Sequence, residues 1–105
     1  MADRYWVNDD ADGDWEGTNN WSATSGGAGG AATPTGSDVV YFNAASSNDN
    51  CTMSAAAACL SLNIGTSGSL YTGTLDAATY DVTIGTGGLD CTYGGSATLD
   101  LGSGT

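Results

Sequence analysis

The chain has 105 residues and a formal net charge of −11, from 11 Asp, one Glu and a single cationic side chain, Arg4. This length suits one domain with one small core, and the charge makes nucleic acid and membrane surfaces poor partners because both repel an acidic protein. Seventeen Gly separate short stretches rich in Thr, Val, Ile, Tyr and Trp, while Glu, Lys, Gln and Arg are nearly absent. The sequence therefore predicts an all-β fold with tight turns.

The first segment, residues 1–23, carries all three tryptophans of the chain. Because most other apolar residues are small, these rings predict the largest buried areas of the core, on the order of 150–250 Å² each. Flat aromatic faces beside carboxylates also suit sugar rings. Beside the core interpretation, we therefore name four candidate residues for docking or glycan binding: Tyr5, Trp6, Trp15 and Trp21.

An acidic stretch in the same segment resembles the opening of a calcium loop. Its oxygen-bearing residues alternate along the chain and a glycine, Gly13, follows, which is the spacing that wraps a hard cation. The twelfth position is Asn19, where the full motif requires Glu, so a solvated acidic turn is the simpler interpretation. Calcium is the one cofactor considered, with these candidate ligands: Asn8, Asp10, Asp12 and Asp14.

Residues 24–38 form a connector of Gly, Ala, Ser and Thr. We interpret residues 1–38 as a Trp-rich docking or capping segment that includes this connector, and residues 39–105 as the main strand region. The short length predicts that both belong to one compact domain.

The strand region repeats itself. Residues 59–66, 79–86 and 96–103 share alternating apolar and polar side chains, at offsets of 20 and 17 residues, and second strands are predicted at 70–75 and 89–93. Since one unit cannot cover its own apolar face, the pattern predicts stacked β-solenoid turns of about 17–20 residues. The predicted stack aligns Leu60, Leu62 and Ile64 with Tyr80, Val82 and Ile84 and with Ala97, Leu99 and Leu101, and places Gly65, Gly85 and Gly102 at equivalent corners. A β-sandwich or meander with similar Gly-rich hairpins is the alternative.

The third copy is followed by no capping element in the sequence. An uncapped turn offers an open strand edge. We expect either that the natural chain continues or that a partner chain covers this edge, and a small core of this kind favours a homo-oligomer such as a trimer.

The three cysteines, Cys51, Cys59 and Cys91, form no zinc-binding pattern. We interpret them as small buried apolar residues, with a Cys51–Cys59 disulfide as the alternative.

The order of motifs in residues 5–42 resembles a known pattern. It consists of Tyr-Trp-Val at 5–7, Gly-Asp-Trp at 13–15, Asn-Trp-Ser at 20–22, the Gly/Ala run at 25–31, Pro34 and Asp-Val-Val-Tyr-Phe at 38–42. This order is similar to the start of phage-type β-solenoid fibre and capsid-decoration proteins. The resemblance implies a virion surface component, and the acidic insert at residues 8–12 departs from the pattern, so contacts made by that loop are not carried over.

The sequence contains few of the side chains that enzymes commonly use for catalysis. There is no His or Lys and no G-x-S-x-G motif, so the remaining route is a carboxylate pair among Asp81, Asp90 and Asp100. These positions fit outward-facing charges better, and no enzymatic activity is predicted.

The leading hypothesis is a tailed-phage structural protein that decorates a capsid or forms part of a fibre, with other virion proteins such as the major capsid protein as partners. The N-terminus lacks a secretion signal and no apolar run could span a bilayer, so we expect synthesis in the host cytoplasm and assembly into a virion. The alternative is a carbohydrate-binding adhesin module on a bacterial surface.

Overall fold

A computed structural model describes residues 2–93 and 97–100 of the chain. It confirms the all-β prediction: the described residues form strands and turns without a helix. The strands are β1 (Asp3–Trp6), β2 (Trp21–Ser22), β3 (Val39–Phe42), β4 (Cys51–Thr52), β5 (Ala57–Ile64), β6 (Thr74–Asp76), β7 (Val82–Asp90) and β8 (Thr98–Asp100).

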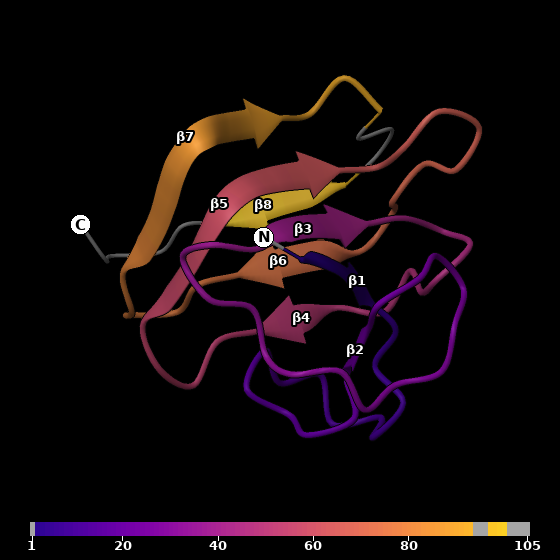
Figure 1. Cartoon of the computed structure of the whole chain (residues 1–105), viewed down its shortest axis with the longest axis horizontal. Coiled ribbons are helices and arrows are strands. Elements are labelled where there is room, and N and C mark those ends of the chain that lie inside the picture. Colours follow the sequence, from indigo (N-terminus) through magenta and orange to yellow (C-terminus); the bar gives the residue numbers. More distant parts are fainter. Residues whose placement is uncertain (1, 94–96, 101–105) are drawn as a thin grey trace.

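These strands form two sheets. The first has the order β2-β1-β3-β5-β7, and the second has the order β4-β6-β8. Apart from the antiparallel β1–β2 pair, every neighbouring pair of strands is parallel. From β3 to β8 the chain alternates between the sheets, and Figure 1 shows β3, β5 and β7 running in one direction and β4, β6 and β8 in the other.

The register of the first sheet follows from side-chain alternation. Val40 pairs with Leu62 and Phe42 pairs with Ile64, and all four side chains are buried. Their neighbours along the strands point to the other face of the sheet, because successive side chains alternate. β5 thus places large apolar side chains directly beside those of β3.

The residue equivalences predicted from the repeats are wrong. In the ladder between β5 and β7, Ala57 pairs with Val82 and Cys59 with Ile84, so Ile84 does not lie beside Ile64. Leu60 is only half-buried, and the buried positions of β5 change phase between Cys59 and Leu62. The ladder is irregular at this point, which switches the face to which the following side chains point.

Part of the third predicted copy belongs to the second sheet. Thr98–Asp100 forms β8, which pairs with β6 in the register Leu75 to Leu99. The strands predicted at 70–75 and 89–93 are confirmed only in part: Thr74 and Leu75 lie in β6 and Leu89 and Asp90 lie at the end of β7, whereas Leu70 lies outside any strand. Leu101 and Gly102 lie outside the described residues, as do Ser96 and residues 103–105 at the end of the chain.

The predicted glycine corners differ from one another. Gly65 follows β5 with φ of +83°, and a Cβ there would overlap the backbone carbonyl of Tyr93. Gly85 instead lies within β7 at the irregular part of the ladder, where a Cβ would sit 3.3 Å from Leu60. Gly87 has a stricter requirement, because its Cβ would come within 2.5 Å of Ser61. Glycine at these two positions lets β7 approach β5 closely.

The core lies between the two sheets and extends to the N-terminal segment. Trp6, Trp15 and Trp21 surround Phe42, and Tyr71 packs against Phe42 with ring centroids 5.2 Å apart. Toward the other end of the fold the core is continued by half-buried side chains of β7, β8 and the residue before β8: Val82, Ile84, Leu99 and Ala97. The N-terminal segment therefore contributes the strands β1 and β2 and most of the aromatic core.

The cysteine prediction is confirmed for two of the three residues. Cys51 and Cys59 are buried, and neither is in a disulfide, so the alternative Cys51–Cys59 bridge is not formed. Burial raises the pKa of the Cys59 thiol to about 11 and also raises that of Cys51. Cys91 is exposed, against the prediction, because it follows the end of β7 on the surface.

Candidate functional site

The candidate aromatic residues divide into two groups. Trp6, Trp15 and Trp21 are at most 1% exposed, so their rings offer no face to a sugar or a partner protein in this structure. Tyr5 is half-buried and points to the opposite face of its strand. A docking or glycan role stays a prediction, and for the tryptophans it would be an indirect one, through the shape of the core.

The buried tryptophans differ in their hydrogen bonding. Trp6 Nε1 donates to the carbonyl of Asp49 at 3.1 Å, and Trp21 Nε1 donates to the carbonyl of Trp15 at 2.7 Å. Trp15 Nε1 is buried without a hydrogen-bond partner. Because an unpaired buried donor is costly, the indole of Trp15 is held by ring packing and burial rather than by its nitrogen.

The outer face of the first sheet carries a half-buried aromatic pair. Tyr5 and Tyr41 are direct neighbours in the parallel ladder of β1 and β3. Their rings stack with centroids 4.6 Å apart and an interplanar angle of 12°. Burial and the nearby carboxylate of Asp3 both raise the pKa of each tyrosine, so both hydroxyls stay neutral at pH 7.

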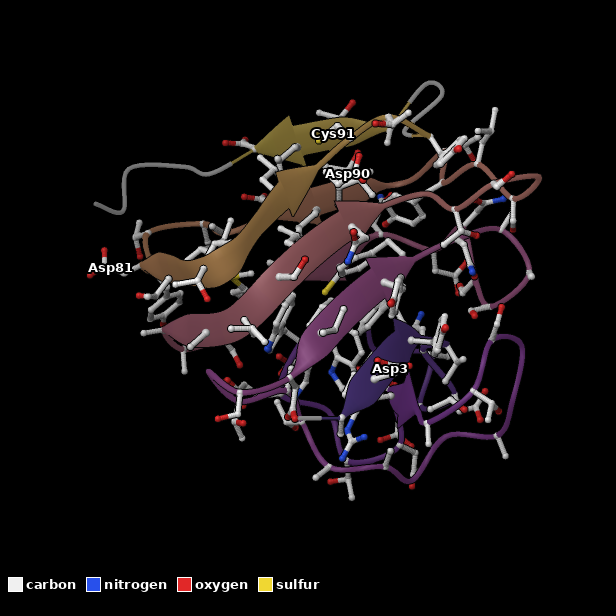
Figure 2. All side chains as sticks on the ribbon, turned by 45° about the horizontal axis from the view of Figure 1, so that its top comes forward. Asp3, Asp81, Asp90 and Cys91 are labelled. Atoms are coloured by element: carbon white, nitrogen blue, oxygen red, sulfur yellow. The ribbon has the colours of Figure 1, made fainter. Side chains whose placement is uncertain are left out.

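The register extends this row across the whole parallel part of the sheet. Tyr41 is paired with Asn63 on β5, and Asn63 is paired with Asp90 on β7. The row on the outer face is therefore Tyr5, Tyr41, Asn63 and Asp90. Asp3 lies two residues before Tyr5 on the same face, and Figure 2 shows Asp3 and Asp90 on the outer strands with β3 and β5 between them.

Polar contacts hold the middle of this row. Asn63 Nδ2 donates to the carbonyl of Val40 at 3.2 Å and to Ser61 Oγ at 3.3 Å, which keeps the amide close to the sheet. Asp90 Oδ1 accepts a 2.9 Å hydrogen bond from the backbone N–H of Thr92. Hydrogen bonds from the side chain and backbone of Thr92 lower the pKa of Asp90, so its carboxylate is charged at neutral pH.

Tyr41 and Asn63 were not among the binding residues named from the sequence, and Asp90 was considered only as a catalytic carboxylate. A signal for Tyr41 was present, because Tyr5-Trp6 and Tyr41-Phe42 are both a tyrosine followed by a large aromatic residue. With alternating side chains, burial of Trp6 and Phe42 places both tyrosines on the outer face.

The predicted calcium ligands are distributed over different hydrogen-bond partners. Asn8 accepts from the N–H of Gly13 and donates to the Asp49 carboxylate, and Asp10 accepts from Asn19. The other two carboxylates bind partners elsewhere: Asp12 accepts from Asn20, and Asp14 accepts from Ser54 Oγ.

The loop has a structural role in this arrangement. The N–H of Trp15 donates to the carbonyl of Thr52, and the N–H of Thr52 donates to the carbonyl of Gly13. The loop therefore continues the second sheet beyond β4 through the bridge of Asp14 to Thr52. Within residues 2–93 and 97–100, no group of three or more His, Cys, Asp or Glu side chains could hold a metal. Calcium binding stays a prediction.

The three carboxylates considered for catalysis lie on or beside strands of two different sheets. Asp90 and Asp100 belong to different sheets. Asp81 precedes β7 and Asp90 ends it, and Figure 2 shows the two at opposite ends of this strand. At about 3.3 Å per residue this separation far exceeds the 5 to 10 Å, roughly, between the carboxyl groups of a glycosidase.

The described residues have neither a pocket nor a helix that is long and apolar enough to span a membrane.

Comparisons with protein-family models, with curated proteins and with solved structures find no match to this chain.

Proposed function

We propose that the chain is a non-enzymatic structural protein of a tailed-phage virion, of the capsid-decoration, head-fibre or tail-fibre kind, and that its sheets are short turns of a β-solenoid. The observation that carries this proposal is the alternation of β3 to β8 between two sheets of parallel strands. A chain that returns to the same sheet with a parallel strand after each turn is coiling in one direction. Stacked turns of this type suit a stiff projection, because backbone groups bond to the turns on either side.

The coil has a distinct first end. The antiparallel strand β2 covers the edge of β1, and the acidic loop continues the second sheet beyond β4. The buried tryptophans fill the space beneath them. These features support the role of the N-terminal segment as a cap or docking module for the coil.

The dimensions of the turns differ from those expected from the repeats. The pairs Cys51 to Leu75 and Leu75 to Leu99 are each separated by 24 residues, and Val40 to Leu62 by 22. The largest offset is 27 residues, from Asn63 to Asp90, so turns of 22–27 residues take the place of the predicted 17–20 in this proposal. In this proposal, side chains on the outer face stay free to contact a particle or a second copy of the chain, with a trimer as one expected assembly.

Electron microscopy of purified native particles, labelled with an antibody against this chain, tests the virion role. The proposal expects label at regular positions on a capsid or tail. Label confined to the cell envelope of a bacterium would contradict it.

The second candidate function is carbohydrate binding by a bacterial surface protein, which the half-buried stacked pair of Tyr5 and Tyr41 on the outer face favours. Trp15→Ala and Trp21→Ala would each remove a whole buried ring from the core and are therefore unsuitable as tests. Glycan-array binding that is lost on Tyr41→Thr, with an unchanged circular dichroism spectrum, would support this second function. Equal binding by wild type and variant would contradict it.

A further inference from the structure

The outer row of the first sheet contains a gap between an aromatic ring and a carboxylate. Asn63 lies between Tyr41 and Asp90 in the ladder, and its amide is held by hydrogen bonds to Val40 and Ser61. Since neighbouring strands lie about 4.8 Å apart, Tyr41 and Asp90 are separated by roughly 10 Å across the shorter Asn63. One face of the Tyr41 ring is covered by Tyr5, and the other face is directed along the row toward Asp90.

The neighbouring row leaves this gap open on one side. Gly88 pairs with Ser61 and lies two residues before Asp90 on β7. A Cβ built on Gly88 would have no atom within 4 Å, so this position borders open space. We refer to the row of Tyr41, Asn63 and Asp90 on the surface of the sheet as the notch.

We propose that this notch binds the guanidinium group of an arginine side chain presented by a partner protein. A guanidinium is planar, stacks on an aromatic face and forms paired hydrogen bonds to a carboxylate. A separation of roughly 10 Å lets one cation lie within about 6 Å of the Tyr41 ring centre and still reach the Asp90 carboxylate.

The charge of the chain favours this occupant over another copy of itself. The net charge is −11, and Asp3 adds a further exposed carboxylate on the same face. The single arginine of the chain, Arg4, already donates to the carbonyls of Ala32 and Asp3. A second copy therefore brings mostly like charges to the notch, whereas a basic protein surface brings the complementary ones.

This inference deepens the proposed function, since it rests on a docking role and names the chemistry of the docked surface. Its test needs no particle: hexa-arginine and hexa-lysine peptides are titrated into the full chain at low salt, followed by calorimetry and by NMR. Wild-type protein should prefer hexa-arginine, with the largest shifts at Tyr41, Asn63 and Asp90.

Two variants with matched controls separate the notch from general attraction between opposite charges. Asp90→Asn should weaken hexa-arginine binding about two- to fivefold more than Glu16→Gln, which removes the same charge from an exposed site elsewhere. Tyr41→Thr should weaken binding by a similar factor relative to Tyr80→Thr, whose ring is exposed, and should abolish the preference for arginine over lysine.

Equal losses in variants and controls, or shifts centred on the acidic loop, would overturn the proposal. Asp90→Asn keeps the test decisive if Tyr41→Thr fails to fold, because Asp90 is exposed at the end of its strand. Failure of the notch would leave antibody labelling of particles unchanged, so the two proposals fail separately.

Discussion

Replacing Trp21 and Trp15 separately by Phe distinguishes a buried hydrogen bond from the burial of an aromatic ring. Both indoles are at most 1% exposed and pack against each other with centroids 4.8 Å apart. The smaller ring should cost about 1–2 kcal/mol at either position through lost contacts and a residual cavity. The two substitutions differ in what happens to the indole nitrogen.

Trp21→Phe also removes the donor to the Trp15 carbonyl and leaves this buried acceptor unpaired, which costs a further 1–3 kcal/mol, approximately. Trp15→Phe instead removes a donor that has no partner, and this gain offsets the lost ring contacts. We expect Trp21→Phe to lower the free energy of unfolding by about 2–5 kcal/mol and Trp15→Phe to stay within about 1 kcal/mol of wild type.

Urea unfolding followed by far-UV circular dichroism measures both values, with the slope of free energy against urea as a check on two-state behaviour. Equal losses at the two positions would refute the reasoning from hydrogen bonding. Negligible losses at both would refute the assignment of these rings to the core.

Four further predictions test the backbone and the thiols. Gly65→Ala should destabilise the protein by clearly more than Gly68→Ala, because both have positive φ but only the Cβ at Gly65 would overlap a neighbouring carbonyl; equal melting temperatures would contradict this. Ala78 has φ of +55°, a left-handed conformation that costs an L-residue roughly 1–2 kcal/mol. Ala78→Gly should therefore raise the free energy of unfolding by up to about 1 kcal/mol, because the greater entropy of Gly in the unfolded chain cancels part of the gain. A loss of stability would argue against strain at this turn. A thiol reagent should modify Cys91 rapidly and the two buried cysteines only after unfolding, and fast modification of all three would count against the buried positions. Burial raises the pKa of the Cys59 thiol from 9.0 to about 11, so the stability that the neutral thiol contributes is complete below pH 9 and is lost as the pH rises toward 11. In a chemical-denaturation series over this pH range, Cys59→Ala should lose less free energy of unfolding than wild type.

Composition and alternation were sufficient to predict the class of the fold and the location of the aromatic core. The register was not predictable in the same way, because period-2 alternation fixes the face of a side chain and leaves its partner strand open. Thr74–Asp76 and Thr98–Asp100 are identical Thr-Leu-Asp triplets that pair as β6 and β8. The repeat alignment instead placed the second triplet with residues of β5 and β7, which belong to the other sheet.

The candidate site could also be predicted only in part, because it depends on the register of the strands. Tyr5 could be named from the sequence as a binding residue, but the row formed with Asn63 and Asp90 depends on two parallel ladders. Those ladders join residues 22 and 27 positions apart. The larger offset follows an irregularity of the β5–β7 ladder, where Gly85 and Gly87 pack closely against β5. Neither offset is visible in the spacing of apolar residues alone.

The coiling of the chain is tested most directly by NMR scalar couplings across backbone hydrogen bonds. The account predicts couplings from the amide nitrogen of Met53 to the carbonyl carbon of Asp76 and from that of Ala77 to Asp100, each one turn further along the chain. It also predicts a coupling from Ala57 to Asp81 in the other sheet. Couplings that instead join consecutive strands in antiparallel hairpins would contradict the alternation of parallel strands on which the proposed function and the notch depend.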